Sequence, residues 1–141
     1  MSIHRYVEIL QLDVPTVASG RVWPKSVVAA CILNLPMPVY GMIGMPSTYS
    51  ELENLPDAKK THVFHDLYIS GGYLYGEVEI FDQALIDFVE ATEGTYAEAV
   101  FRVAALTKMS VNAFGDPQIA HMELKSINAM PGERILTGEV I

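Results

Sequence analysis

Two potential nucleophiles and two potential bases in this chain are candidates for a hydrolytic site. The nucleophiles are Ser110 and Cys31, and the bases are His62 and His65. A serine hydroxyl reacts only when a base within hydrogen-bond reach removes its proton, so Ser110 would need one of these histidines. The histidines are an odd number of positions apart in a predicted strand, where side chains alternate between faces. Only one of them can therefore point toward Ser110.

Each of these residues also has a structural interpretation. A histidine or a serine within a strand is more often part of the scaffold than of a catalytic site, and His4 and His121 belong to no motif. Cys31 lies in an apolar run, which is typical of a small buried hydrophobe, and a single cysteine cannot form an internal disulfide. We assign it no chemistry.

The sequence predicts neither a metal site nor a cofactor. His62, His65 and Asp66 lie close together, but the chain has no cysteine pair and no His-Glu-x-x-His spacing. The glycines Gly41 and Gly44 precede Pro46 and no helix N-terminus, so we expect no nucleotide phosphate there.

Composition limits the partners of this chain. Its 141 residues fit one domain over residues 1–141, and half of them are apolar. The formal charge of −8, with nine scattered Lys and Arg residues, argues against nucleic-acid binding and favours protein partners. No apolar run approaches the roughly 20 residues needed to cross a bilayer. The N-terminus lacks the pattern of a secretory signal, so we expect synthesis in the cytoplasm.

Residues 61–82 predict a β-hairpin around which the other elements can be placed. Two runs rich in Val, Ile, Phe and Tyr flank Ser70-Gly71-Gly72, and glycines suit a tight turn. Leu74, Gly76, Val78 and Ile80 alternate with polar or aromatic residues, which predicts a strand with one buried face.

The remaining elements complete a mixed α+β domain. A long polar loop runs up to Lys60, and Asp82 is a favourable N-cap for a helix that ends near Gly94. Residues 95–111 are ambiguous, and we favour a strand for their second half. The sequence predicts a mainly antiparallel sheet or a small barrel with two short helices. The predicted strands are 4–14, 39–43, 61–69, 73–81, 100–111 and 118–128, and the predicted helices are 25–33 and 83–94.

Five segments, in order, resemble a known family. They are Ser19-Gly-Arg-Val-Trp-Pro24, Gly41-Met-Ile-Gly-Met-Pro46, Thr61-His-Val-Phe-His-Asp-Leu-Tyr68 with Tyr75-Gly-Glu-Val-Glu-Ile80, Met109-Ser-Val-Asn112 and Ile127-Asn-Ala-Met-Pro131. Together they resemble the prohead core (head maturation) serine proteases of tailed phages, which are related in fold to the herpesvirus assembly proteases. The similarity spans residues 12–131 and implies the same fold.

The resemblance also implies that catalytic residues have been replaced. Met45 stands where the family has the histidine base of a His-Pro motif, and Met42 and Gly44 replace acidic residues before it. Ser110 matches the nucleophile, and Asn112 stands where an arginine of the oxyanion region is usual. A thioether cannot accept a proton at neutral pH, so we interpret the chain as a pseudo-protease.

The resemblance implies a role in the phage head. We expect a capsid-associated structural protein, such as a decoration, cement or head-assembly protein, in the head of the virion. Its expected partners are the major capsid protein or other head proteins, and further copies of itself. The alternative is an active protease that cleaves scaffold and capsid precursors through Ser110, with His62 or His65 as a relocated base.

Overall fold

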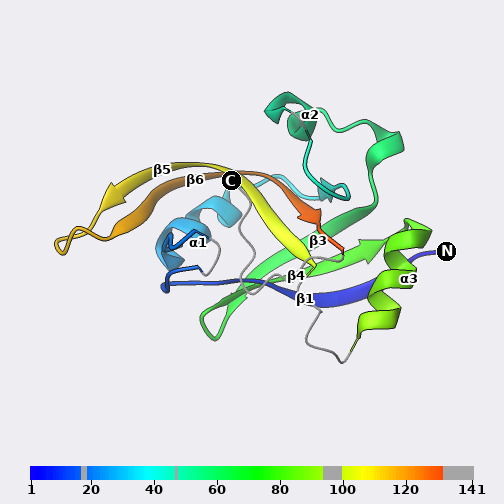
Figure 1. Ribbon diagram of the computed structural model, residues 1–141, viewed down its shortest axis with the longest axis horizontal. Helices are drawn as coiled ribbons and strands as arrows, with labels where there is room; N and C mark the ends of the chain where they lie inside the picture. Colours follow the sequence, from blue (N-terminus) through cyan, green and yellow to red (C-terminus); the bar gives the residue numbers. More distant parts are fainter. Residues whose placement is uncertain (17–18, 47, 94–99, 132–141) are drawn as a thin grey trace.

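The computed structural model describes residues 1–16, 19–46, 48–93 and 100–131, which form six strands and four helical segments. Figure 1 shows a four-stranded sheet crossed by a long two-stranded ribbon. The strands are β1 (Ile3–Gln11), β2 (Val39–Gly41), β3 (His62–Ser70), β4 (Tyr73–Ile80), β5 (Phe101–Val111) and β6 (Pro117–Ala129). The helical segments are α1 (Lys25–Leu33), α2 (Tyr49–Glu53), the 3-10 turn η1 (Asp57–Lys59) and α3 (Gln83–Thr92).

The four-stranded sheet has the order β1-β4-β3-β2, and all of its neighbours are antiparallel. Its centre is the predicted hairpin, in which Gly71 and Gly72 adopt φ angles of 58° and 83°. Such positive angles are what a two-residue turn requires and what glycine adopts without strain. The hairpin prediction and its turn are confirmed.

The predicted buried face of β4 is confirmed. Leu74, Gly76, Val78 and Ile80 are buried, and the residues between them are half-exposed. Position 76 requires glycine, because a Cβ there would lie 2.5 Å from Cδ1 of Phe64 on β3. The aromatic ring therefore occupies the space above the glycine.

The two predicted helices are present. The side chain of Asp82 accepts a hydrogen bond of 3.0 Å from the backbone N–H of Leu85, as expected of an N-cap. The structure has one α-helix more than the sequence predicts, because α2 forms within the polar loop. Lys125 on β6 donates hydrogen bonds to Glu53 of α2 and to Glu123, and this tertiary contact holds the short helix. None of the described helices has the length and apolarity needed to span a membrane.

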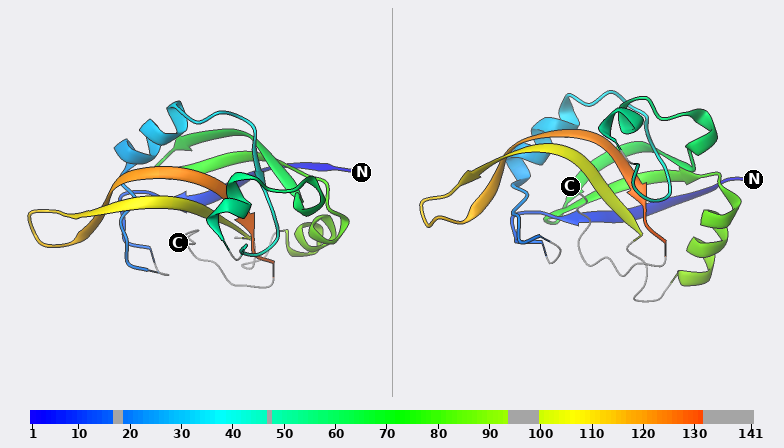
Figure 2. Two further views of the ribbon diagram at one scale, coloured as in Figure 1. Left: turned by 90° about the horizontal axis from the view of Figure 1, so that it is seen from above. Right: turned by 45° about the horizontal axis from the view of Figure 1, so that its top comes forward.

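The β5–β6 ribbon differs in detail from the predicted alternation. Its register shifts at Lys125 and at Ala120, two β-bulges in β6, and each bulge changes the face on which the following residues lie. Ile119 and Met122 are consequently both buried, although an uninterrupted strand would place them on opposite faces. Figure 2 shows that the turn end of this ribbon projects beyond the four-stranded sheet. Residues 95–99 of the ambiguous segment and the predicted tail from Gly132 lie outside the described residues.

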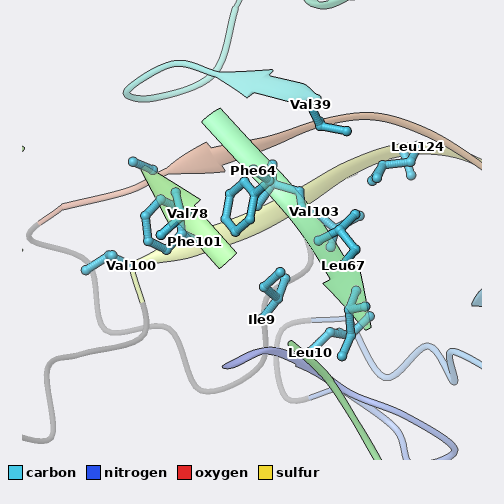
Figure 3. Close-up of a cluster of buried hydrophobic side chains, with 14 of the residues drawn as sticks. Ile9, Leu10, Val39, Phe64, Leu67, Val78, Val100, Phe101, Val103 and Leu124 are labelled. Carbon is cyan, nitrogen blue, oxygen red and sulfur yellow. The ribbon is translucent and has the colours of Figure 1, made fainter. Parts of the chain in front are cut away.

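The core lies between the ribbon and the inner face of the four-stranded sheet. In Figure 3, Phe64 and Val78 of the sheet face Phe101 and Val103 of β5. Side chains of α1 and α3, such as Val28 and Leu85, join the same cluster. On one side, the chain after β2 connects the two layers through a bridge between Ile43 and Ala129. The described strands thus form a four-stranded and a two-stranded sheet that enclose the core between them.

Gly76→Ala is expected to destabilise the fold by about 2 kcal/mol, because the new methyl group must displace the Phe64 ring. Urea denaturation measures this change. Phe64→Leu in the same chain should recover part of the loss, since it frees the space above residue 76. Ser70→Ala, at an exposed position of the same hairpin, is the control and should change stability little. A double-mutant cycle with no coupling would contradict this packing.

Candidate functional site

His62 is a buried, fully hydrogen-bonded residue at the start of β3. Its Nε2 lies 2.6 Å from the backbone oxygen of Ile127, and its Nδ1 lies 2.9 Å from Oγ1 of Thr61. A carbonyl can only accept, so Nε2–H donates to Ile127 and Nδ1 accepts from the threonine hydroxyl. Burial lowers the pKa of His62 to about 4, although the hydrogen bond to Ile127 opposes this shift. The imidazole is neutral and has no free nitrogen.

The surroundings of His62 leave no room for a substrate. Its ring makes edge contacts with Phe64 and Phe101 at centroid distances of 5.7 and 5.0 Å. On the β2 side, a Cβ on Gly41 would lie 2.1 Å from the Ile127 oxygen and 2.3 Å from His62 Nε2. Thr61, the hydroxyl that contacts the imidazole, is itself 8% exposed. The Thr61–His62 pair is therefore part of the core.

His65 lies on the opposite, solvent-exposed face of the sheet, as the odd spacing predicts. Its Nε2 is 2.9 Å from Oε1 of Glu79, and its ring stacks near that of His4 at 6.3 Å. Hydrogen bonds from His65 and Ser2, together with the nearby His4, hold the pKa of Glu79 below its usual value. The groups that His65 contacts belong to β1 and β4, and none of them is Ser110.

Ser110 is not brought together with either histidine. It lies near the outer end of β5, exposed and directly opposite Gln118. Val103, the β5 partner of Ile127, is seven positions away, which corresponds to about 20 Å along a strand. His62 contacts the Ile127 end of the ribbon, and Ser110 belongs to the other end. Among the described residues, Ser110 forms no side-chain hydrogen bond to a histidine.

Asn112 has a structural role in the turn that ends the ribbon. Its side-chain oxygen accepts hydrogen bonds of 2.9 Å from the backbone N–H groups of Phe114 and Asp116. Its amide nitrogen lies 3.3 Å from Oδ2 of Asp116. These bonds close the loop, as asparagine commonly does in turns. Asn112 therefore lies at the turn end of the ribbon, whereas Met45 contacts Asn128 near the opposite end of β6.

Met45 instead packs beside the other end of β6. Its sulfur accepts a hydrogen bond of 3.6 Å from Nδ2 of Asn128, and the backbone N–H of Gly44 donates to Ala129 at 2.8 Å. Oγ of Ser126 donates to Oδ1 of Asn128 at 2.8 Å. Ser126 and Asn128 are fully buried, whereas Met45 is 40% exposed. We call Met45, Ser126 and Asn128 the Met45 cluster.

The Met45 cluster is polar but has no acid–base chemistry. An amide and a thioether do not accept protons at neutral pH, so nothing in the cluster can activate the Ser126 hydroxyl. On β5, the residues directly opposite Ser126 and Asn128 are Ala104 and Arg102. Ala104 therefore supplies no reactive group opposite Ser126, and Arg102 lies opposite Asn128.

Sequence reasoning missed Ser126 and Asn128 as members of the Met45 cluster. Asn128 belongs to the motif that ends at Met130 and Pro131. The motif gives no indication that its side chain contacts Met45. The contact joins residues 83 positions apart, and no periodicity within either segment indicates it.

Cys31 is unsuited to nucleophilic attack. It lines a groove of about 620 Å³ between α1 and β6, whose walls include Val27, Ala30, Met122 and Leu124. Burial raises the pKa of the Cys31 thiol, so the reactive thiolate is disfavoured at neutral pH. In the residues that the structure describes, no group of three or more His, Cys, Asp or Glu side chains is arranged to hold a metal ion.

The arrangement of a mainly antiparallel sheet crossed by a curved two-stranded ribbon, with three short α-helices, is the α+β fold of the phage prohead proteases. The fold predicted from the motifs is thus confirmed. Among solved structures, that of the bacteriophage T4 capsid assembly protease, gp21, is similar to this chain. The TM-score is 0.68 at 15% sequence identity, over 92% of this chain and 82% of that protein. No family model and no curated protein matches the sequence.

The buried His62 makes the fold sensitive to acid. An unfolded chain protonates this histidine near pH 6.5, whereas the folded chain resists protonation until about pH 4. Between these values the unfolded state binds more protons, so stability falls as the pH falls, by up to about 3 kcal/mol from this group. Urea denaturation from pH 7 to pH 4.5 measures the effect.

His62→Gln is the informative variant, because its amide can still donate toward Ile127 but does not titrate. We expect it to be less stable than the wild type at pH 7 and to depend less steeply on pH. His121→Gln, at an exposed position of β6, is the matched control and should keep a slope close to that of the wild type. The same slope in His62→Gln and the wild type would contradict this account.

Proposed function

We propose that this chain is a head-assembly or capsid-associated structural protein of a tailed phage, built on a prohead-protease fold without proteolytic activity. The Met45 cluster is the observation that carries this proposal. At the position where the resemblance places a histidine base, a thioether contacts an asparagine amide. The neighbouring hydroxyl, Ser126, is buried and donates to that same amide.

The alternative bases are both committed to other contacts. His62 uses both ring nitrogens inside the core, and His65 contacts Glu79 on the outer face of the sheet. Removing the base or the nucleophile of a serine protease typically costs about 10⁴ to 10⁶ in rate. A relocated triad with Ser110 would require a rearrangement of the ribbon over most of its length.

A structural role requires contact surfaces, and the projecting ribbon offers one. Near its turn, Val111 is 69% exposed and Phe114 is 89% exposed. Large exposed apolar side chains at the end of a projecting hairpin are typical of protein contact sites. We propose that the partners are the major capsid protein or other head proteins, and further copies of this chain.

Purified protein should not react with a fluorophosphonate probe, which labels serines activated by a base, and should not cleave phage head precursors. The physical reason is that Ser110 lies at the other end of the ribbon from His62, and that the Ser126 hydroxyl donates to an amide oxygen, which is not a base. An active serine protease serves as the positive control. Labelling or cleavage that disappears in Ser110→Ala would show that the chain is an active protease and would refute the proposal.

Mature particles should contain this chain as a stoichiometric component of the head. A structural protein persists after assembly, whereas a protease that digests itself during maturation leaves few copies. Quantitative mass spectrometry of purified virions, with the major capsid protein as the internal reference, measures the ratio. Full-length chain that is present in proheads but lost from mature heads would contradict a structural role.

A further inference from the structure

The outer face of the four-stranded sheet, on the side away from the core, presents aromatic and acidic side chains in three cross-strand rows. Each row consists of residues directly opposite one another on β1, β4 and β3. We call these nine residues the outer sheet face. They are Tyr6–Glu77–Asp66, Glu8–Tyr75–Tyr68 and Gln11–Tyr73–Ser70.

The tyrosines of the outer sheet face form an accessible aromatic surface. The rings of Tyr68 and Tyr75 are stacked with a centroid distance of 5.6 Å, and Tyr73 lies 6.2 Å from Tyr75. Tyr6 is 73% exposed and Tyr68 is 37% exposed. Tyrosine is enriched in the residues that dominate binding energy at protein interfaces, because it contributes a large apolar ring and a polar group.

Within the part of the chain that the structure describes, the carboxylates of this face have no cation of their own. Asp66 lies directly opposite Glu77, an arrangement of like charges that destabilises a sheet. None of the three rows contains Lys or Arg, and within the described ranges Glu8, Asp66 and Glu77 form no ion pair. A cation from another molecule would relieve this repulsion.

One intramolecular contact shows how a cation is held on the same side of the sheet. Nζ of Lys60 lies 4.2 Å from the centre of the Tyr40 ring and 2.7 Å from Oδ1 of Asp57. An aromatic face and a carboxylate thus hold one ammonium group together, which is a known pairing for Lys and Arg. The outer sheet face offers the same two groups, and no lysine of the described segments occupies them.

We propose that the outer sheet face binds an extended, arginine-rich segment of a partner protein. Guanidinium groups would stack on the tyrosine rings and pair with Asp66, Glu77 and Glu8. Rows on one face of a strand repeat about every 7 Å, and alternate side chains of an extended peptide repeat at the same spacing. The planar guanidinium fits a ring and a carboxylate better than an ammonium does.

Charge complementarity favours this occupant over a second copy of the chain. Two outer sheet faces brought together would place their unpaired carboxylates against one another with no Lys or Arg between them. The inference is independent of the proposed loss of catalysis, because this face is separated from the Met45 cluster by the sheet and the core.

Fluorescence anisotropy with the full chain and labelled octapeptides tests the proposal. We expect an alternating Arg–Thr peptide to bind most tightly, a Lys–Thr peptide more weakly, and a Glu–Thr peptide not to bind. Asp66→Asn with Glu77→Gln should weaken the Arg–Thr peptide by about tenfold, since it removes the charge-assisted hydrogen bonds. Asp87→Asn with Glu90→Gln on α3 changes the net charge equally and should leave the affinity nearly unchanged.

Thermal denaturation of each variant checks that it is folded, which is expected because the changed residues are at the surface. Equal losses in the two double variants would show only diffuse attraction and would overturn the proposal. Equal affinity for the Arg–Thr and Glu–Thr peptides would also overturn it. Sedimentation that shows a dimer, dissociated by Tyr68→Ser with Tyr75→Ser, would overturn it in favour of a second copy of the chain.

Discussion

The hydrogen bond from His62 to the backbone oxygen of Ile127 joins the two layers of this protein. It links the first residue of β3 to β6, at the point where Phe64 and Phe101 pack against the same imidazole. Gly41 passes so closely over this bond that no larger residue fits. The position of the ribbon over the sheet, and with it the position of the Met45 cluster, depends on this contact. A charged imidazole would be incompatible with it, because burial disfavours the protonated form.

This constraint also decides what the histidine can do. A catalytic base must exchange protons with a substrate-accessible hydroxyl, whereas His62 is held neutral between Thr61 and Ile127 in the interior. The same fold in a protease requires a base elsewhere, and the Met45 cluster occupies the end of β6 with a thioether, an amide and a buried hydroxyl. The chain thus keeps a polar cluster that stabilises the connection after β2, and the cluster contains no group with a pKa suited to proton transfer.

The outer side of the same sheet has a different character. The core side requires apolar residues and glycines, and the outer side carries tyrosines and carboxylates whose charges are not balanced within the sheet. Strand alternation makes both sets of residues available from one hairpin, since successive side chains point to opposite faces. One hairpin therefore supplies the scaffold on one face and a candidate binding surface on the other.

Local patterns in the sequence determined the hairpin, the two main helices, the β5–β6 turn and the α+β class, because each depends on neighbouring residues and on a period of two or 3.6. The ordered motifs also indicated the family of folds. Tertiary structure alone decided that Ser110 and Met45 lie at different ends of the ribbon, and that Asn128 and not Ser110 contacts Met45. Two bulges in β6 decided which face Ile119 occupies, and a contact with Lys125 decided that α2 forms. These outcomes depend on pairings between residues distant in the chain, which no local period encodes.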